Sequence, residues 1–402
     1  MENHQVGESD PLEAIEFEVP AFHVEFKYVV VFEEQIGSPG SIPDTTLVEY
    51  YITKINKDQE GSIPEKSLQY QHNMRKRKIV VIGGGTGTFT VLSGLKMYRK
   101  EERLDLSAVV SMSDDGGSTG LLRDELGVLP PGDIRQCLVA LSTSGELMRK
   151  LMNYRFPKGA LEGHNFGNLL LSALEKVTGD FGSAVEKTSE ILRCEGKIIP
   201  VTLSHVSLRA ELQDGKEIIG QRNVLFSDLS SMKKISLTPK AKSNPRAVKA
   251  ILEADVVVIG PGEFYTSIIP NLLVPGIPEA LKKTKAKKVF VCNLMKRSLH
   301  TKNFFVEDFA KTIEKFITTD LDVVVYNNKV PPKALVQKYA REGEFPVDIS
   351  VPKKDINSHI SYIGGDLLNK KIMKPAKGDL IARNLIRHNP EKLAKLILKI
   401  LK

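Results

Sequence analysis

The fold is decided by the stretch Lys78-Ile79-Val80-Val81-Ile82-Gly83-Gly84-Gly85-Thr86-Gly87. Its apolar residues follow one another without polar alternation, which is typical of a parallel strand buried on both faces. The glycines end that strand, and the apolar spacing from Thr88 to Tyr98 predicts a helix directly after them. Strand, glycine turn and helix in this order predict one unit of a parallel α/β sheet.

Further apolar runs repeat this plan along the chain. Candidate strands cover Leu106–Met112, Val256–Ile259, Val289–Val291 and Val323–Tyr326. The last three follow plausible helices and precede polar or turn-forming residues. Because strands alternate with helices, the sequence predicts a doubly wound, Rossmann-like parallel sheet.

The pattern changes between Asp133 and Arg193. Amphipathic helices are predicted there, with no strand between them, at Asp133–Ser142, Glu146–Tyr154, Asn168–Val177 and Ser183–Leu192. This predicts a helical region inserted into the sheet at about 133–193. A strand-rich region is predicted after it at Ile198–Val224, with Asp214-Gly215 as a hairpin turn. A closing helix is predicted at Pro390–Lys402.

Residues 1–74 differ from the rest of the chain in charge. They carry 14 acidic and 4 basic side chains, a balance of −10, whereas the remainder carries 35 acidic and 53 basic, a balance of +18. Within them, Phe22–Tyr28 predicts an edge strand and Gly37–Pro43 a loop. The sequence thus predicts an acidic N-terminal extension of unknown role at 1–74 and an α/β domain at 75–402. Translation starting at Met74 is the alternative, because the basic cluster there leads directly into the first strand.

Composition is that of a soluble globular protein, with 41% hydrophobic and 26% charged residues. Cys137, Cys194 and Cys292 are odd in number and far apart, which predicts neither a disulfide framework nor a zinc site. The apolar runs are shorter than a membrane span, and no secretory signal pattern is present, so a cytoplasmic protein is expected. The basic residues form no compact stripe, which favours a phosphate-bearing small molecule over a nucleic acid as the partner.

A phosphate site is predicted at the glycine turn, at Gly83, Gly84, Gly85, Thr86 and Gly87. A strand that ends in glycines and opens a helix aims backbone N–H groups and the positive helix end at one point. The dinucleotide fingerprint is incomplete, because Thr90 stands where its third glycine belongs. A Walker-type sequence is missing as well. The alternative is a tight structural turn between strand and helix.

A second candidate element follows the next predicted strand, with the residues Ser113, Asp114, Asp115, Gly116 and Gly117. Doubly wound folds place the acid that binds a ribose hydroxyl in this position. Asp114 or Asp115 could take that role or hold a magnesium ion on a phosphate, and the glycines could form a second anion nest. An Asp-rich helix cap or turn is the structural alternative.

Polar residues in and before the predicted helical region add candidates. Asp133 is predicted to cap the helix that follows it. Arg135, in the first turn, opposes the helix dipole, which predicts an anionic partner such as a ligand, and Arg123 could form a similar contact. His164 and Asn168 lie four residues apart and could either bind a ligand base or sugar or satisfy a helix start.

The last candidate element follows the predicted strand Val256–Ile259. It combines glycines, hydroxyls and a helix start at Gly260, Pro261, Gly262, Tyr265, Thr266 and Ser267. Asn271 and Asn293 could add amide contacts. Because open parallel sheets bind ligands at the carboxyl ends of their strands, all these elements are expected to meet at one edge of the sheet.

In this order, the elements resemble the gluconeogenesis factor family, UDP-sugar-binding morphogenesis factors related to 2-phospho-L-lactate transferase. The resemblance covers about Lys76 to the C-terminus and rests on Gly83–Gly87, Ser113–Gly117, Pro130–Arg135, Gly163–Asn168 and Gly260–Ser267. It implies a cytoplasmic UDP-sugar-binding regulator required for cell shape and cell-wall synthesis during gluconeogenic growth. Cell-wall synthesis proteins are the implied partners, and a homo-oligomer is left open. No reaction is established for this branch, so no catalytic residue is assigned.

Two departures from the family pattern concern loops. After Asn293-Leu294-Met295, relatives usually continue with a Thr-Gln-Pro-Gly-Glu-Thr type of loop, whereas this chain has Lys296–Thr301 with two cations in place of the Gly-Glu pair. Gly220-Gln221-Arg222 likewise replaces a usual Gly-Glu pair. Two other functions stay open: a phospholactyl- or nucleotidyl-type transferase that uses a divalent ion, and a dinucleotide oxidoreductase, against which the incomplete fingerprint counts.

Overall fold

The computed structural model describes residues 28–29, 53–54, 75–349, 359–369 and 386–401. The chain divides into two units, Met1–Arg75 and Lys76–Lys402. In the first unit, the described residues form the antiparallel strands β1 (Tyr28–Val29) and β2 (Thr53–Lys54). The predicted strand Phe22–Tyr28, apart from Tyr28, and the predicted loop Gly37–Pro43 lie outside the described residues.

The second unit is built on a parallel sheet, which within the described residues has seven strands in the order β14-β12-β10-β9-β3-β4-β5. Every neighbouring pair in it is parallel. The strands are β3 (Arg77–Gly83), β4 (Leu104–Val110), β5 (Lys197–Pro200), β9 (Val256–Ile259), β10 (Lys287–Val291), β12 (Val323–Asn327) and β14 (Ser361–Gly365). The predicted doubly wound sheet is therefore confirmed. Its strand order reverses between β3 and β9, where such folds open a crevice.

Helices cover both faces of this sheet. Ile79, Val80, Val81 and Ile82 of β3 are at most 2% exposed although their side chains alternate in direction. One group of helices has α2 (Gly85–Met97) against α4 (Gly132–Leu141) and α14 (Pro390–Ile400). A second group has α11 (Ile277–Lys283) against α9 (Pro245–Leu252) and α12 (Val306–Ile317). The described helices include none with the length and apolar content of a membrane span.

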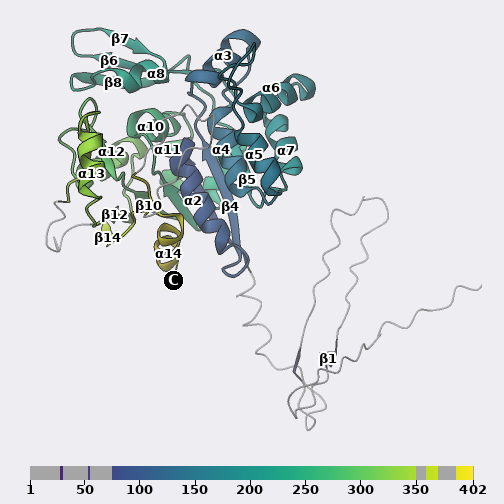
Figure 1. Cartoon of the computed structure of the whole chain (residues 1–402). Coiled ribbons are helices and arrows are strands. Elements are labelled where there is room, and N and C mark those ends of the chain that lie inside the picture. The colour runs from purple at the N-terminus through teal and green to yellow at the C-terminus, as the bar shows by residue number, and fades with distance from the viewer. Residues whose placement is uncertain (1–27, 30–52, 55–74, 350–358, 370–385, 402) are drawn as a thin grey trace, which may run out of the picture. The chain divides into compact units, whose positions relative to one another are not determined.

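The predicted helical region lies between β4 and β5 (Figure 1). Its α4, α5 (Glu146–Asn153), α6 (Phe166–Thr178) and α7 (Phe181–Ile191) each begin and end within two residues of the prediction. An unpredicted helix, α3 (Gly117–Leu126), precedes them. It begins at a glycine of the second candidate element, which accords with the helix-start part of the structural alternative for these residues.

A small antiparallel sheet follows β5, with the strand order β7-β6-β8 and bounds β6 (Ser207–Leu212), β7 (Glu217–Ile219) and β8 (Met232–Thr238). Asp214 and Gly215 lie in the β6–β7 turn, and Gly215 has φ +85, so the predicted hairpin is confirmed. The predicted strand-rich region is wrong beyond Ile219, because Gln221–Phe226 forms helix α8. Figure 1 shows this sheet and α8 at the same end of the unit as α3.

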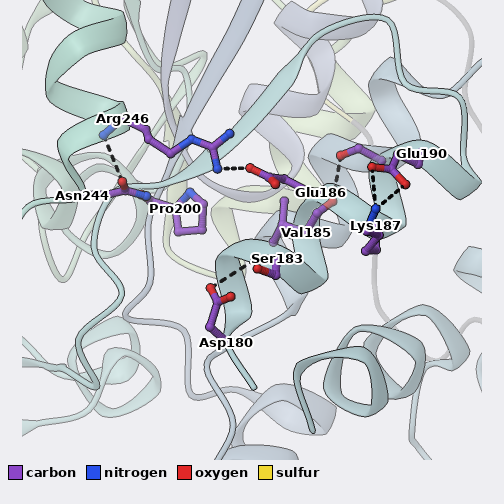
Figure 2. A network of polar contacts seen from close by, with 10 residues as sticks. Asp180, Ser183, Val185, Glu186, Lys187, Glu190, Pro200, Asn244 and Arg246 are labelled. Atoms are coloured by element: carbon purple, nitrogen blue, oxygen red, sulfur yellow. Dashed lines mark hydrogen bonds and ion pairs between the residues drawn. The ribbon is translucent and has the colours of Figure 1, made fainter. Parts of the chain in front are cut away.

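Polar contacts fasten α7 to the start of α9 (Figure 2). Arg246 of α9 forms an ion pair with Glu186 of α7. Asn244 accepts a hydrogen bond from the Arg246 N–H and donates one to the Pro200 carbonyl at the end of β5. The helical region is thereby joined to both the end of β5 and the first helix after the small sheet.

The remaining elements lie in the connections between the strands β9, β10, β12 and β14. They are η1 (Phe264–Ile268), α10 (Ile269–Leu272), β11 (Met295–Arg297), α13 (Lys333–Ala340) and β13 (Glu344–Pro346), with β11 antiparallel to β13. The closing helix was predicted at Pro390–Lys402 and ends at Ile400, and Lys402 lies outside the described residues.

Replacing Gly94 with alanine tests the contact between α2 and α14. Alanine normally stabilises a helix interior by about 1 kcal/mol relative to glycine. A Cβ at Gly94 would overlap the backbone carbonyl of Pro390, however, so we expect Gly94→Ala to destabilise the protein by about 1–3 kcal/mol. Chemical denaturation measures the change. Gly145→Ala is the control, because its Cβ would meet nothing within 4 Å, and an equal effect of both variants would contradict the predicted contact.

Candidate functional site

The predicted glycine turn lies at the carboxyl end of β3, beside the point where the strand order reverses. Helix α2 begins at Gly85, and its N-cap, Gly84, offers no side chain to cap the first N–H groups. Gly85 has φ +61, a conformation that favours glycine. The turn therefore presents the helix start as predicted, and Thr86 on it is exposed and donates to Gln136 Oε1 over 3.3 Å.

Gly87 has a structural reason to be glycine. A Cβ at this position would overlap the carbonyl of Pro261 in the turn after β9. The two glycine turns thus approach each other across the reversal in strand order, and Gly262 lies close enough that its Cβ would be 3.7 Å from the Gly84 oxygen. The contact at Gly87 accords with the structural alternative for that residue, whereas Gly84 and Gly85 remain at the open helix start.

Asp133 lies against the start of α2 rather than capping its own helix. The prediction that it caps α4 is wrong, because the N-cap of α4 is Pro131 and no side chain caps it. A Cβ on Gly84 would overlap the Asp133 carboxylate, and the Gly85 N–H donates to that carboxylate. A long-range contact has replaced the local one, and an acid occupies part of the predicted anion site.

Asp114 is the second acid of this region. Removal from water and, to a smaller extent, the charge of Asp114 raise the pKa of Asp133 to about 8, against the opposing effects of Arg135 and the Gly85 N–H. Removal from water also raises the pKa of Asp114, against hydrogen bonds from the Gly116 N–H and the Thr119 hydroxyl. Two interacting, half-buried acids beside a helix start therefore form the most unusual electrostatic feature near the turn.

Asp115 has a separate role from Asp114. Its two oxygens accept hydrogen bonds of 2.8 Å from the N–H groups of Gln221 and Arg222, at the start of α8. Arg123 donates to the Asp114 carbonyl over 2.9 Å and to the Val206 carbonyl over 3.0 Å. Both residues connect the loop after β4 to the small sheet, which accords with the structural alternative for Asp115.

Arg135 finds its partners within the protein. It is 8% exposed and donates to Asn168 Oδ1 over 3.0 Å and to Asn153 Oδ1 over 2.7 Å. Arg135 also interacts by charge with Asp133, so protein groups supply its partners and no ligand is required to explain its position.

His164 and Asn168 meet at a residue that the prediction omitted. His164 Nδ1 and Asn168 Nδ2 each lie 3.4 Å from the Ser118 hydroxyl oxygen, which also accepts from the Asn165 N–H over 3.2 Å. Ser118 is 5% exposed and lies in the first turn of α3. Its place just after the second glycine pair was the only sequence signal. Ser113 lies nearby in sequence and contacts the Ser111 hydroxyl over 3.1 Å.

Amides join the turn after β9 to the rest of the edge. Asn271 Nδ2 donates to the Gly83 carbonyl over 3.2 Å, and Asn293 Nδ2 donates to the Gly262 carbonyl over 2.7 Å. Within the part of the chain that the structure describes, Asn271 Oδ1, Asn293 Oδ1 and Thr266 Oγ1 are buried and have no hydrogen-bond partner. Buried polar atoms without a hydrogen-bond partner are costly, so these three atoms are candidates for contact with a polar group that the chain itself does not supply.

Charged residues beyond the predicted set lie beside this turn. The Arg297 guanidinium is 3.6 Å from Glu263 and 3.5 Å from Glu344. Burial raises the pKa of both carboxyls, and Arg297 opposes the rise. In the loop Lys296–Thr301, which differs from the family pattern, Lys296 pairs with Asp348 over 2.6 Å and His300 Nε2 lies 3.1 Å from the Val224 carbonyl. The added cations are therefore engaged with protein groups, and Tyr265 lies against His300.

The structure thus brings most predicted residues to one edge of the sheet but assigns them different roles. Around the reversal in strand order lie Gly83, Gly84, Gly85, Thr86, Gly87, Asp114, Asp133, Gly260, Pro261, Gly262, Thr266, Ser267, Asn271 and Asn293. Side-chain networks that connect neighbouring elements hold Ser113, Asp115, Arg123, Arg135, His164 and Asn168, whereas Gly116 and Gly117 open α3.

Comparisons with known proteins agree with this architecture. Residues 79–368 match the family model described as 2-phospho-L-lactate transferase CofD. The chain is 43% identical to a protein of Aquifex aeolicus, over 82% of this chain and 98% of that protein. It is 38% identical to a Thermotoga maritima protein, over 80% and 99%, and 37% identical to a Bacillus subtilis protein, over 82% and 99%. All three carry the name gluconeogenesis factor.

Solved structures give the same picture. Two crystal structures of a UPF0052-family protein from Bacillus halodurans are similar to this chain at 35% identity, with TM-scores of 0.72 and 0.73. They cover 81% of this chain and 99% and 100% of the crystallised chains. The predicted fold class is confirmed at this level too.

Replacing Asp133 with asparagine tests whether the pKa of Asp133 is raised in the folded protein. The unfolded chain releases this proton near a pKa of about 3.9, whereas the folded chain keeps it up to about 8. The contribution of Asp133 to the free energy of unfolding is therefore fully present below the pKa of the unfolded chain. It is lost as the pH rises through the pKa of the folded chain. Asparagine has no proton to lose, so we expect the stability of Asp133→Asn relative to the parent to increase from pH 5 to pH 8, with a size on the order of several kcal/mol at most.

Urea denaturation at both pH values, in the presence of a chelator, measures this difference. Asp322→Asn is the control, because it makes the same carboxylate-to-amide change at an exposed side chain that pairs with Lys288, so the effect of the exchange itself can be subtracted. A parent-to-variant difference that stays constant with pH would show that Asp133 titrates normally.

Proposed function

This chain belongs to the gluconeogenesis factor family, and on that premise we propose that it binds a nucleotide sugar of the UDP-sugar class at the reversal in strand order. The diphosphate would lie at the start of α2, between the turns after β3 and β9. The observation that carries the proposal is the meeting of two glycine turns at a helix N-terminus whose N-cap residue, Gly84, has no side chain. Backbone N–H groups and the helix dipole favour an anion there.

The neighbouring acids set a condition on this binding. A carboxylate at Asp133 would repel a diphosphate, but its pKa of about 8 keeps the acid neutral at physiological pH, so that it can donate a hydrogen bond. A magnesium ion bridging the acids and the diphosphate would relieve the repulsion in a second way. We therefore expect nucleotide affinity to fall above pH 8 without a divalent ion and to depend less on pH when magnesium is present.

The unpartnered polar atoms support an occupant that offers donors as well as acceptors. Asn271 Oδ1 and Asn293 Oδ1 accept, and the Thr266 hydroxyl can do either. The hydroxyl groups of a ribose or a sugar could satisfy such atoms. We propose a regulatory role for the bound state, in the cytoplasm, in which the nucleotide sugar biases contact with cell-wall synthesis proteins and so affects cell shape during gluconeogenic growth.

A transferase is the second candidate function. One observation favours it: Asp114 lies beside Asp133, not only beside Asp115 in sequence, and both acids have raised pKa values. Two carboxylates fit a magnesium ion, which prefers oxygen ligands and would stabilise charge on a phosphoryl group when bound. Asp114 and Asp133 would hold that ion, while Asp115 keeps its place at the start of α8. The matching family model carries the name of a transferase.

Calorimetry of the full chain tests the binding proposal. UDP-N-acetylglucosamine, UDP-glucose, GDP and NAD are titrated with and without magnesium, and UDP-sugars should bind most tightly. A Cβ at Gly262 would have only ordinary contacts of 3.5 Å or more, so Gly262→Val should fold normally while its methyl groups narrow the crevice. We expect at least a tenfold loss of affinity, corresponding to about 1.4 kcal/mol. Full UDP-sugar affinity in Gly262→Val would place the nucleotide elsewhere, and Gly145→Val is the matched control.

Product analysis separates the two functions. Incubation with UDP-sugars, GDP-linked phospholactate and magnesium should leave the nucleotides intact if the chain is a regulator. If nucleotide is released by the parent but not by Asp114→Asn, and both bind the UDP-sugar, the transferase function would replace the regulatory function as the proposal.

A further inference from the structure

A cluster of three possible metal ligands lies at the end of the parallel sheet where the strands begin. Glu314 is on α12, Asp320 is in the connection from α12 to β12, and His359 precedes β14 by two residues. β12 and β14 are parallel neighbours, so the amino ends of both strands lie at the same end of the sheet. The glycine turns follow the carboxyl ends of their strands and therefore lie at the opposite end. The cluster is therefore separate from the candidate nucleotide site.

The donor atoms already have spacings close to those of a bound ion. His359 Nε2 lies 2.8 Å from Glu314 Oε1 and 3.7 Å from Asp320 Oδ1, and all three donor atoms lie within 4.8 Å of one another. With metal–ligand distances of about 2.0–2.2 Å, tetrahedral geometry places neighbouring donors about 3.3 Å apart. The two measured distances lie on either side of that value, so side-chain rotations alone could complete the geometry.

The backbone orients the Glu314 carboxylate and places Asp320 beside it. The Leu321 N–H donates to Glu314 Oε1 over 2.9 Å, which orients a carboxylate that is only 16% exposed. Helix α12 ends at Thr318 in the left-handed region, with φ +53, and the chain then turns back towards the helix. Asp320 is brought beside Glu314 by this turn, and it is 80% exposed, so an ion can reach it from solvent.

We propose that Glu314, Asp320 and His359 form a binding site for a divalent transition-metal ion of the zinc class. One imidazole nitrogen with two carboxylate oxygens suits zinc, cobalt or manganese, whereas magnesium and calcium prefer oxygen alone. Water fills the remaining coordination positions, because two of the ligands are exposed. The ion connects α12 to the chain segment that enters the edge strand β14, and it thereby stabilises that edge of the sheet.

The competing explanation is a plain ion pair between His359 and Glu314. An imidazolium beside two carboxylates leaves one negative charge uncompensated, and a divalent cation with neutral imidazole balances both. The ion pair and the metal site differ in what Asp320 does: the pair does not need it, since its nearest oxygen is 3.7 Å from the imidazole, whereas the metal site does. Asp320 is therefore the residue on which the test depends.

The test uses the full chain without an affinity tag, freed of metal by a chelator that is then removed. Zinc is titrated by calorimetry, and cobalt binding is followed by its visible absorbance, in the presence of excess magnesium. We expect the parent to bind one equivalent more of each ion than Asp320→Asn or His359→Ala. We also expect zinc to raise the thermal midpoint of the parent by more than that of either variant.

His205→Ala is the matched control, because His205 is exposed and outside the cluster, and it should keep the extra equivalent. Subtracting the zinc stoichiometry and cobalt absorbance of each variant from those of the parent removes any contribution of other histidines and of the cysteines. Asp320→Asn changes one exposed atom type, so it should fold as the parent does even if His359→Ala does not. Equal zinc stoichiometry and equal cobalt absorbance in the parent and Asp320→Asn would overturn the proposal.

Discussion

Two backbone turns meet at the reversal in strand order with no room for a side chain at Gly87, and the arrangement of the two turns depends on that contact. A Cβ at Gly87 would overlap the Pro261 carbonyl, so α2 can begin where it does only because glycine occupies this position. Asn271 and Asn293 fasten the same two turns by donating to Gly83 and Gly262. Gly87 is therefore needed by the fold before any ligand is considered, and the helix start that a ligand could use is one that Asp133 already contacts.

The two acids beside that helix start show how a stable sheet can accommodate an unfavourable group. Partial burial raises the pKa of both Asp114 and Asp133, and the charge of Asp114 adds to the cost of ionising Asp133. A fold under no functional demand would replace such a pair with neutral residues of similar size. Acids with raised pKa values are typical of functional sites, where they bind protons, metal ions or phosphate groups.

The sequence predicted those features that depend on short-range pattern. The strands of Val256–Ile259 and Ile79–Ile82, the helices between β4 and β5, and the glycine turns all follow from local spacing. What it could not predict were the partners of single polar side chains. Asp115 accepts a hydrogen bond from the N–H of Gln221, 106 positions away, at the start of a helix that lies where a strand was predicted. Arg135 likewise meets Asn168 through the packing of α4 and α6, which no local rule encodes.

The reversal of strand order also has a consequence for biosynthesis. β3 and β4 are adjacent in the chain, but the other edge of β3 pairs with β9, which the ribosome makes only after the whole helical region and the small antiparallel sheet. Until then, β3 presents a row of unpaired N–H and C=O groups on an apolar strand, the kind of edge that joins strands of other chains. The nascent chain must shield this edge for much of its synthesis, and a chaperone that binds extended apolar segments would be most needed in that interval.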